Sequence, residues 1–506
     1  MPVYAALGSK GGVASQHYLA TIEGLRVLEK GGNAFDASTT ISSILTVMLP
    51  HTSSAGGDGF LLALDGGSEL IAYNGSGRSP QNFPVEEYLT EKPVRGPLTV
   101  TVPGLIDLWE WVNENYGSMD LSQLLGRAIS LAKNGFYVQE SLAQAVELAQ
   151  PILAEYDGWS KVFGSMVTGS WARFKRLGRI YDTVAKRGAD SFYRSKLTEE
   201  IVEDLSKLGS PLTYEDFAEH KGMEVTPIKC ERRGYELYEL PPNTQGLSTL
   251  QLLKAIEMVE LSKLPFESPE RVTEFFRLAT EIYEDRDRYV ADPCFYKTPV
   301  DKLLSPAYLR KKLNKGYSNQ GVLNHNDTTF FVVADRHGNL VGFIQSIFHS
   351  FGSGIVVHGI PFQSRGAGFA QTSGLPNSPA PRKRPLHTLS ILLGCHSDEG
   401  DHLIGCAGGD LRPQIHSEIF VNVADYKMPL SRAVEMPRYI LTSWKENNWQ
   451  ATVEEGAWRA GLPRWVSKIG CQSPSMGIVH AARRRRDGVL EFVADPRGGG
   501  VAAALL

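Results

Sequence analysis

Hydrophobic residues recur at helical spacing through the first part of the chain, up to about Leu208, and at strand-like spacing in much of the rest. The apolar positions within 18–28 predict a helix that ends at Gly31-Gly32. Asn33 can cap a second apolar helix that runs to Leu49. Helices first and many strands later favour a layered α/β body over a winding of successive βαβ units.

Further elements follow from the same periodicities. Apolar runs bounded by turn residues predict strands, and apolar residues three or four positions apart predict helices. Strands are expected over 60–64, up to Tyr73, and over 231–240, 389–393, 403–407, 476–481 and 489–494, and helices around 109–111, over 121–132 and 198–208, from Ser248, from Ser268 and over 413–423.

The segment 327–348 has the clearest hairpin pattern. Two runs of β-branched and aromatic residues flank Arg336-His337-Gly338, and Gly338 can take the left-handed conformation of a three-residue loop. If Asp335 and Asn339 flank that loop, counting back sets Thr328 opposite Ser346. Two hydroxyl groups would then share one face. By itself, this pattern is better explained by an ordinary core hairpin that starts with a Thr pair.

Composition predicts a globular, enzyme-sized protein. The 506 residues are 42% hydrophobic and 21% charged, and the net charge of -4 gives no reason to expect nucleic-acid binding. The one basic run, 483–486, is interpreted as a solvated hairpin turn. The glycine-rich loop 50–59 leads into a strand, whereas a phosphate-binding loop needs Lys-Ser/Thr at a helix start. Close backbone packing explains this loop better.

Cysteines and the N-terminus bear on the compartment. Five cysteines without CxxC spacing predict a reducing compartment rather than disulfides or a zinc site. The chain has neither a leader-like N-terminus nor 18 unbroken apolar residues, so we expect a cytoplasmic protein with no membrane partner. No motif for a metal or another cofactor is present, and neither GxSxG nor HExxH occurs.

Ten short motifs occur in the order seen in γ-glutamyltranspeptidases, and together they cover nearly the whole chain. The sequence therefore resembles this family, although each motif alone is weak. The motifs are 31–37 (GGNAFDA), 56–60 (GGDGF), 102–104 (VPG), the Pro-Pro loop at 241–246, 327–329 (DTT), 351–354 (FGSG), 384–386 (RPL), 408–409 (GG), 436–438 (MPR) and 495–497 (DPR).

The resemblance implies an N-terminal-nucleophile hydrolase with a four-layer αββα core, which is an α/β (α+β) fold. Such a protein is made as a precursor and cuts itself before a threonine. Carried over, the cut falls between Asp327 and Thr328 and gives a large subunit, 1–327, and a small catalytic subunit, 328–506, which stay together as one folded body.

The chemistry of an N-terminal threonine agrees with this reading. A free α-amino group has a pKa of about 7.7–8.0 and can act as the base that a threonine hydroxyl needs. Thr328 would supply both nucleophile and base, and Ser346 could orient its hydroxyl. The resemblance implies that the backbone N–H groups of Gly408 and Gly409 stabilise the oxyanion. Cys406, close to this pair, is interpreted as a buried structural thiol.

Four positions depart from the family pattern. By eye, Val85 replaces the arginine that pairs with the γ-glutamyl carboxylate, and Phe348 replaces an asparagine. Gly368 replaces the aspartate that binds the amine, and His387-Thr388 replaces a serine pair. Of the candidate replacement cations, Arg78, Arg95 and Arg365, the last is favoured because it shares a loop with Gly368. Phe348 and Phe369 would make the acyl pocket more apolar.

We therefore expect an autoprocessed threonine amidohydrolase that forms an acyl-enzyme on Thr328, with an acyl group other than free γ-glutamyl. His387, Thr388, Phe348 and Arg365 are the expected substrate-binding residues. Two alternatives stay open: a glutathione hydrolase or γ-glutamyltransferase with substituted anchors, and an unprocessed, non-catalytic binding homologue. The expected partners are a small-molecule or peptide amide and, as an option, further copies of the chain. Water is favoured over an amine as acceptor.

Overall fold

The central hairpin lies where the sequence places it. The computed structural model describes residues 3–266, 268–315, 320–325, 327–445, 448–458 and 461–506. Strands β11 (Thr329–Asp335) and β12 (Leu340–Ser346) are antiparallel and buried along their whole length. Their register pairs Thr329 with Gln345, which sets the preceding residue, Thr328, opposite Ser346. The predicted register is therefore confirmed.

Two seven-stranded antiparallel sheets contain most of the strands. The hairpin sheet has the order β22 (Val501–Leu505), β2 (Gly11–Ser15), β11, β12, β3 (Asp58–Asp65), β4 (Glu69–Asn74) and β7 (Met223–Glu224). The second sheet has the order β1 (Ala6–Gly8), β21 (Leu490–Ala494), β20 (Ile478–Arg484), β16 (Gly400–Ala407), β15 (Leu392–His396), β9 (Tyr235–Glu239) and β8 (Ile228–Arg232).

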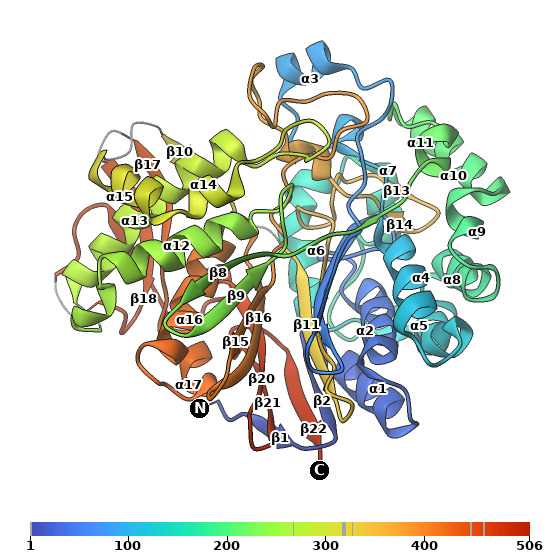
Figure 1. Cartoon of the computed structure of the whole chain (residues 1–506). Helices are drawn as coiled ribbons and strands as arrows, with labels where there is room; N and C mark the ends of the chain where they lie inside the picture. Colours follow the sequence, from blue (N-terminus) through green and yellow to red (C-terminus); the bar gives the residue numbers. More distant parts are fainter. Residues whose placement is uncertain (1–2, 267, 316–319, 326, 446–447, 459–460) are drawn as a thin grey trace.

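The two sheets pack face to face through an apolar core that includes Phe330, Ile344 and Leu403. A Cβ added to Gly405 would lie 2.5 Å from the Phe330 ring, so glycine allows this close approach. Helices cover both outer faces and complete four layers (Figure 1). The covering helices are α1 (Tyr18–Glu29), α2 (Ala34–Met48), α4 (Leu105–Tyr116) and α5 (Leu121–Asn134) on the hairpin sheet, and α12 (Gly246–Met258), α13 (Pro269–Tyr289) and α16 (Arg412–Ala424) on the second sheet.

Local signals explain several boundaries. Asn33 forms a capping box with Asp36 at the start of α2, as its position before an apolar run indicates. Gly56 and Gly57 lie against backbone: a Cβ on Gly57 would meet the Ser346 carbonyl oxygen at 2.6 Å. The interpretation of 50–59 as a close-packing loop is therefore confirmed.

Three expectations were wrong in detail. The expected strand over 389–393 begins only at Leu392, because the residues before it form an irregular segment beside the hairpin. The strand expected from residue 476 begins at Ile478, after a short 3₁₀ turn. The basic run is not a turn throughout, since Arg483 and Arg484 belong to β20 and Arg484 forms an ion pair with Asp401.

A separate four-stranded sheet was not expected from the sequence. It has the order β10 (Gly321–Val322), β17 (Tyr439–Lys445), β18 (Asn448–Glu454) and β19 (Val466–Ile469). Its first strand precedes Thr328 by only a few residues and thereby ties the segment before the expected cut to the second half of the chain. In the described part of the chain, no helix combines the length and apolar character that a membrane span requires.

Candidate functional site: a threonine hydroxyl at the end of the central hairpin

Two hydroxyl groups meet the carbonyl group that precedes Thr328. The Oγ1 atom of Thr328 lies 3.1 Å from the Ser346 Oγ and 2.6 Å from the Asp327 carbonyl oxygen. Ser346 Oγ donates to the same carbonyl oxygen at 2.9 Å and accepts from the backbone N–H of Phe348 at 2.9 Å. Both hydroxyl groups therefore face the peptide group that joins Asp327 and Thr328.

Arg412 contacts the same threonine, and the sequence reasoning missed it. Its Nη2 donates to Thr328 Oγ1 at 2.6 Å, and its Nε donates to the Cys406 carbonyl oxygen at 2.7 Å. The residue is fully buried, and this burial lowers the pKa of its guanidinium to about 10. One sequence signal was available: a cation at the start of an apolar helix faces the unfavourable end of the helix dipole.

Gly408 and Gly409 form the turn between β16 and α16, next to Arg412. The Gly409 carbonyl oxygen accepts from Arg412 Nη1 at 3.2 Å and from Gln245 Nε2 at 2.9 Å. The N–H groups of both glycines have no hydrogen-bond partner among the described residues. The Arg412 side chain therefore links this turn to Thr328. The turn offers two backbone N–H groups that are free among the described residues.

Asp410, the next residue, binds the segment that precedes the expected cut. Its backbone N–H donates to the Asn324 carbonyl oxygen at 3.0 Å, and the Asn324 N–H donates to its carboxylate at 3.0 Å. Arg286 pairs with the same carboxylate at 2.7 Å. The strand-like approach of residues 320–325 is thus held against the Gly408-Gly409 turn.

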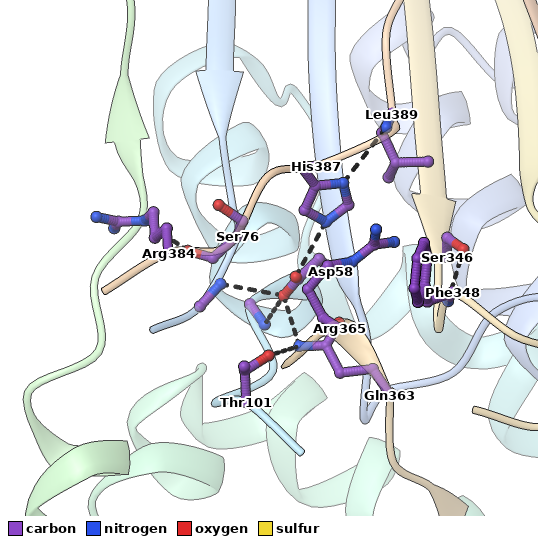
Figure 2. Close-up of polar contacts among 12 residues, drawn as sticks. Asp58, Ser76, Thr101, Ser346, Phe348, Gln363, Arg365, Arg384, His387 and Leu389 are labelled. Atoms are coloured by element: carbon purple, nitrogen blue, oxygen red, sulfur yellow. Dashed lines mark hydrogen bonds and ion pairs between the residues drawn. The ribbon is translucent and has the colours of Figure 1, made fainter. Parts of the chain in front are cut away.

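Arg365 and Phe348, both expected at the substrate, are stacked on each other. The Arg365 guanidinium carbon lies 4.1 Å from the centre of the Phe348 ring (Figure 2). Its Nη1 lies 3.5 Å from Thr388 Oγ1. Its Nε and Nη2 are buried and have no hydrogen-bond partner in the described part of the chain. Burial lowers the pKa of this guanidinium to about 9. The structure thus brings together Arg365, Phe348 and Thr388 beside Ser346.

His387 faces Asp58 instead of an open space. Its Nδ1 accepts from the Leu389 N–H at 3.4 Å, so Nε2 carries the proton and donates to Asp58 Oδ2 at 3.2 Å (Figure 2). Burial, together with the nearby positive charges of Arg365 and Arg412, keeps the pKa of His387 well below its ordinary value. Burial also raises the pKa of Asp58 to about 7.

The other two expected cations have different surroundings. Arg95 donates to the carbonyl oxygen of Ser350 at 2.8 Å and lines the same cavity as Thr328. Arg78 lines a different, small pocket with Arg384. Val85, at the expected position of the family's arginine, packs against an aromatic cluster that includes Phe369. Of the three candidates, Arg365 is the one that contacts Phe348 and Thr388.

A cavity of about 720 Å³ opens beside Thr328. One wall is formed by α6 (Glu140–Leu153), on which Leu148 and Ile152 leave 77% and 54% of their surface exposed. Such exposure of large apolar side chains in a cavity indicates a binding surface. The cavity is also lined by Leu49, Ala145, His325 and Thr328.

Comparison with known proteins agrees with the fold. A cephalosporin acylase from Bacillus halodurans superposes with a TM-score of 0.87 at 28% identity and covers 99% of this chain and 97% of its own. The stacked antiparallel sheets, their helical layers and this neighbour define an N-terminal-nucleophile hydrolase fold.

The family follows from the sequence comparisons. Residues 20–505 match the family model described as Gamma-glutamyltranspeptidase, and the chain belongs to this family. The glutathione hydrolase-like YwrD proenzyme of Bacillus subtilis (strain 168) is 32% identical, over 99% of both chains. The oxamate amidohydrolase proenzyme of Klebsiella pneumoniae is 29% identical, over 98% of this chain and 99% of its own. The protein is therefore an enzyme of the N-terminal-nucleophile hydrolase and transferase class, with an autoprocessed, amidohydrolase-like or acylase-like role.

Proposed function

We propose that the chain cuts itself between Asp327 and Thr328 and then hydrolyses amides through an acyl-enzyme on Thr328. The products would be a large subunit, 1–327, and a small subunit, 328–506, held together by the shared four-layer core. The observation that carries this proposal is the pair of hydroxyl groups at the Asp327 carbonyl, 2.6 Å and 2.9 Å from its oxygen.

The groups at this site can carry out every proton transfer that the self-cleavage requires. Thr328 Oγ attacks the Asp327 carbonyl carbon while its proton passes to Ser346 Oγ, 3.1 Å away. Ser346 in turn gives its own proton to the carbonyl oxygen. In the resulting neutral adduct the new hydroxyl group gives its proton to the threonine nitrogen as the C–N bond breaks, the C=O bond forms again, and an ester remains on Oγ. Water then hydrolyses the ester and frees the α-amine of Thr328.

The mature enzyme would use that amine as its base. An α-amino group with a pKa of about 7.7–8.0 is partly neutral at physiological pH and can take the proton of the Thr328 hydroxyl. Ser346 would orient the hydroxyl, and the free N–H groups of Gly408 and Gly409 would bind the oxyanion. A donor of this kind contributes about 3–4 kcal/mol to transition-state stabilisation. Water is the proposed acceptor.

An anionic acyl group fits the surroundings of Thr328 best. Arg365 offers two unsatisfied, buried N–H-bearing nitrogens, and a carboxylate is the partner that a guanidinium binds most strongly. Gly368 brings no carboxylate for an α-amine. A substrate with a carboxylate but without the amine of a γ-glutamyl group would therefore bind better than free γ-glutamyl.

The cavity beside α6 would hold the amine half of the amide. Leu49, Leu148 and Ile152 provide an apolar wall there, so an apolar amine would bury surface that a small polar amine leaves exposed. The proposed substrate class is thus a small-molecule or peptide amide that joins an anionic acyl group to an apolar amine. Free thiols at all five cysteines support placement in the cytoplasm.

A denaturing gel and two chromogenic substrates test the proposal. Purified protein should give two bands, the smaller with Thr328 at its N-terminus, while a Thr328→Ala protein should stay as one. Glutaryl-p-nitroanilide should release its aniline faster than γ-glutamyl-p-nitroanilide. Brisk turnover of the γ-glutamyl compound would instead favour the glutathione hydrolase reading that the YwrD relative suggests. A single uncut band from the wild-type chain would favour the non-catalytic binding homologue.

A further inference from the structure

Arg412 is held in place by the backbone and aimed at the nucleophile. Two of its nitrogens donate to backbone carbonyl oxygens, Nε to Cys406 at 2.7 Å and Nη1 to Thr388 at 2.6 Å. The third, Nη2, donates to Thr328 Oγ1 at 2.6 Å. Among the described residues the guanidinium forms no ion pair, although it is completely buried. No structural carboxylate therefore accounts for its charge.

We propose that Arg412 is a catalytic residue that acts on the oxygen of Thr328 in both reactions of this protein. It holds Oγ in the attacking position and stabilises the negative charge that develops on the reacting oxygens. This inference rests on the proposed self-cleavage at Asp327-Thr328 and adds a group that the hydroxyl pair alone does not supply.

The geometry restricts what Arg412 can do. A guanidinium is a donor only, so it cannot serve as the base that accepts the threonine proton. Because Nη2 donates to Oγ1, the hydroxyl proton must point elsewhere, toward Ser346 or the Asp327 carbonyl oxygen. A positive charge in a water-excluded site also favours charge build-up on oxygen more strongly than it would in water. Arg412 therefore directs the proton and stabilises the attack.

The competing explanation is a purely structural role, in which Arg412 joins β16 to the segment around Thr388 through hydrogen bonds to backbone carbonyl oxygens. Arg384 provides a matched control, because it is also a buried arginine that donates to two backbone carbonyl oxygens. Its Nε donates to Ser76 at 2.9 Å and its Nη2 to Lys221 at 3.2 Å, and in Figure 2 its side chain points away from Phe348 and Ser346. A structural role predicts that substitution of either arginine changes the cleavage rate to a similar extent. A catalytic role predicts a larger change for Arg412.

The first test compares self-cleavage rates on denaturing gels. Arg412→Gln and Arg412→Lys should slow the appearance of the two bands by about 100-fold or more, the usual effect of removing one transition-state donor. Arg384→Gln should be cut within about threefold of the wild-type rate, since a residue that only joins backbone segments adds nothing to the stability of the transition state. Folding is checked by thermal unfolding in the uncuttable Thr328→Ala background, with and without each arginine substitution.

A second test uses chemical rescue, which a merely structural role would not give. In Arg412→Ala, millimolar guanidinium or methylguanidinium should accelerate cleavage by about tenfold or more, because the small cation can occupy the vacated position. The same ions should not accelerate the Arg384→Ala chain. Propylammonium serves as the control cation, because it lacks the planar fork of a guanidinium.

The outcomes separate the two levels of the argument. If the wild-type chain is never cut, the proposed function fails before Arg412 is tested. If the wild type is cut and the Arg412 variants are cut at the same rate, the catalytic assignment is wrong. Failure of all three Arg412 variants to fold, or slow cleavage of a folded variant without rescue, would assign the residue to packing and likewise overturn the proposal.

Discussion

Two groups of buried arginines lie in this molecule, and they differ in how their charge is matched. Arg438 and Arg497 share Asp495, at 2.5 Å and 3.1 Å, and Arg497 also pairs with Glu454. Two cations and two carboxylates thus form a neutral cluster beside α17 (Leu430–Glu435). This cluster joins segments between residues 434 and 497 through charge-assisted hydrogen bonds, and its charges are balanced without any further group.

The arginines beside Thr328 are equally buried but lack such partners. Neither Arg365 nor Arg412 forms an ion pair among the described residues. Asp58, the acid with the largest effect on Arg365, has its pKa raised to about 7 by burial. Asp410, the carboxylate with the largest effect on Arg412, pairs with Arg286 instead. An unpaired buried charge costs several kcal/mol. Burial is therefore common to both groups. A missing carboxylate alone does not distinguish a site, since Arg384 is buried and forms no ion pair among the described residues either. The missing carboxylates beside Thr328 and Ser346 are what the predictions below put to the test.

The largest expected difference is in stability. In the Thr328→Ala background, Arg497→Met should lower the free energy of unfolding by about 3–5 kcal/mol, because Glu454 and Asp495 lose a buried partner. Arg365→Met should leave it unchanged or raise it, since Met removes an unpaired charge and keeps apolar volume. Denaturant titration of the two precursors measures both. A large loss at Arg365 would mean that its charge is already matched and would end the comparison.

The next difference is in activity. In the mature enzyme, Arg365→Met should lower kcat/KM for an anionic acyl donor by about 100-fold, the scale of a lost charge-assisted pair. The same substitution should change turnover of a neutral acetyl amide by less than about threefold, since no carboxylate is then left unpaired. Steady-state kinetics with the two acyl groups on one leaving amine provide the measurement. Equal losses on both substrates would show that Arg365 supports the fold of the site and does not read the acyl group.

These two groups also show what the sequence could predict. The hairpin register follows from residues adjacent in the chain, because turn chemistry and strand alternation fix it locally. Arg365 could be proposed from its neighbour Gly368 in one loop. Arg412 could not, because its partner Thr328 lies 84 residues away and only the stacking of β16 against the hairpin brings them together.

Other gaps have similar physical reasons. The small sheet of β10 and β17–β19 joins short strands from separate parts of the chain, and such pairings leave no local signal. The His387–Asp58 contact spans 329 residues. The four-layer architecture, by contrast, came from the family resemblance and is confirmed, while the cleavage position and the roles of individual residues stay predictions.

A smaller effect is expected at Phe348, which has a backbone φ of 77°. Asparagine tolerates this left-handed conformation better than phenylalanine does. Phe348→Asn should therefore relieve backbone strain and leave stability nearly unchanged despite the lost packing. It should raise KM for the anionic donor about fivefold to tenfold, because the stacking that positions Arg365 contributes about 1–2 kcal/mol. A Phe348→Leu variant keeps the apolar volume without the aromatic face, and an unchanged KM in both would show that the ring does not position the arginine.

The smallest expected effect is the pH dependence contributed by Asp58. Burial raises the folded-state pKa of this carboxyl from 3.8 to about 7, so the folded chain holds a proton that the unfolded chain has lost between these values. Stability from this group is complete below the unfolded pKa and falls as the pH rises through the folded pKa.

Asp58→Asn cannot titrate, and its Oδ1 can still accept from Gly77 and Gly104. In the Thr328→Ala background, unfolding free energies at pH 6 and pH 7 should therefore show a loss about 1 kcal/mol larger with Asp58 than with Asn. Because buried histidines such as His387 act in the opposite direction in both proteins, only the difference between them isolates Asp58. A difference that does not change with pH would mean that Asp58 is already ionised and partly compensates Arg365, which would weaken the contrast between the two arginine groups.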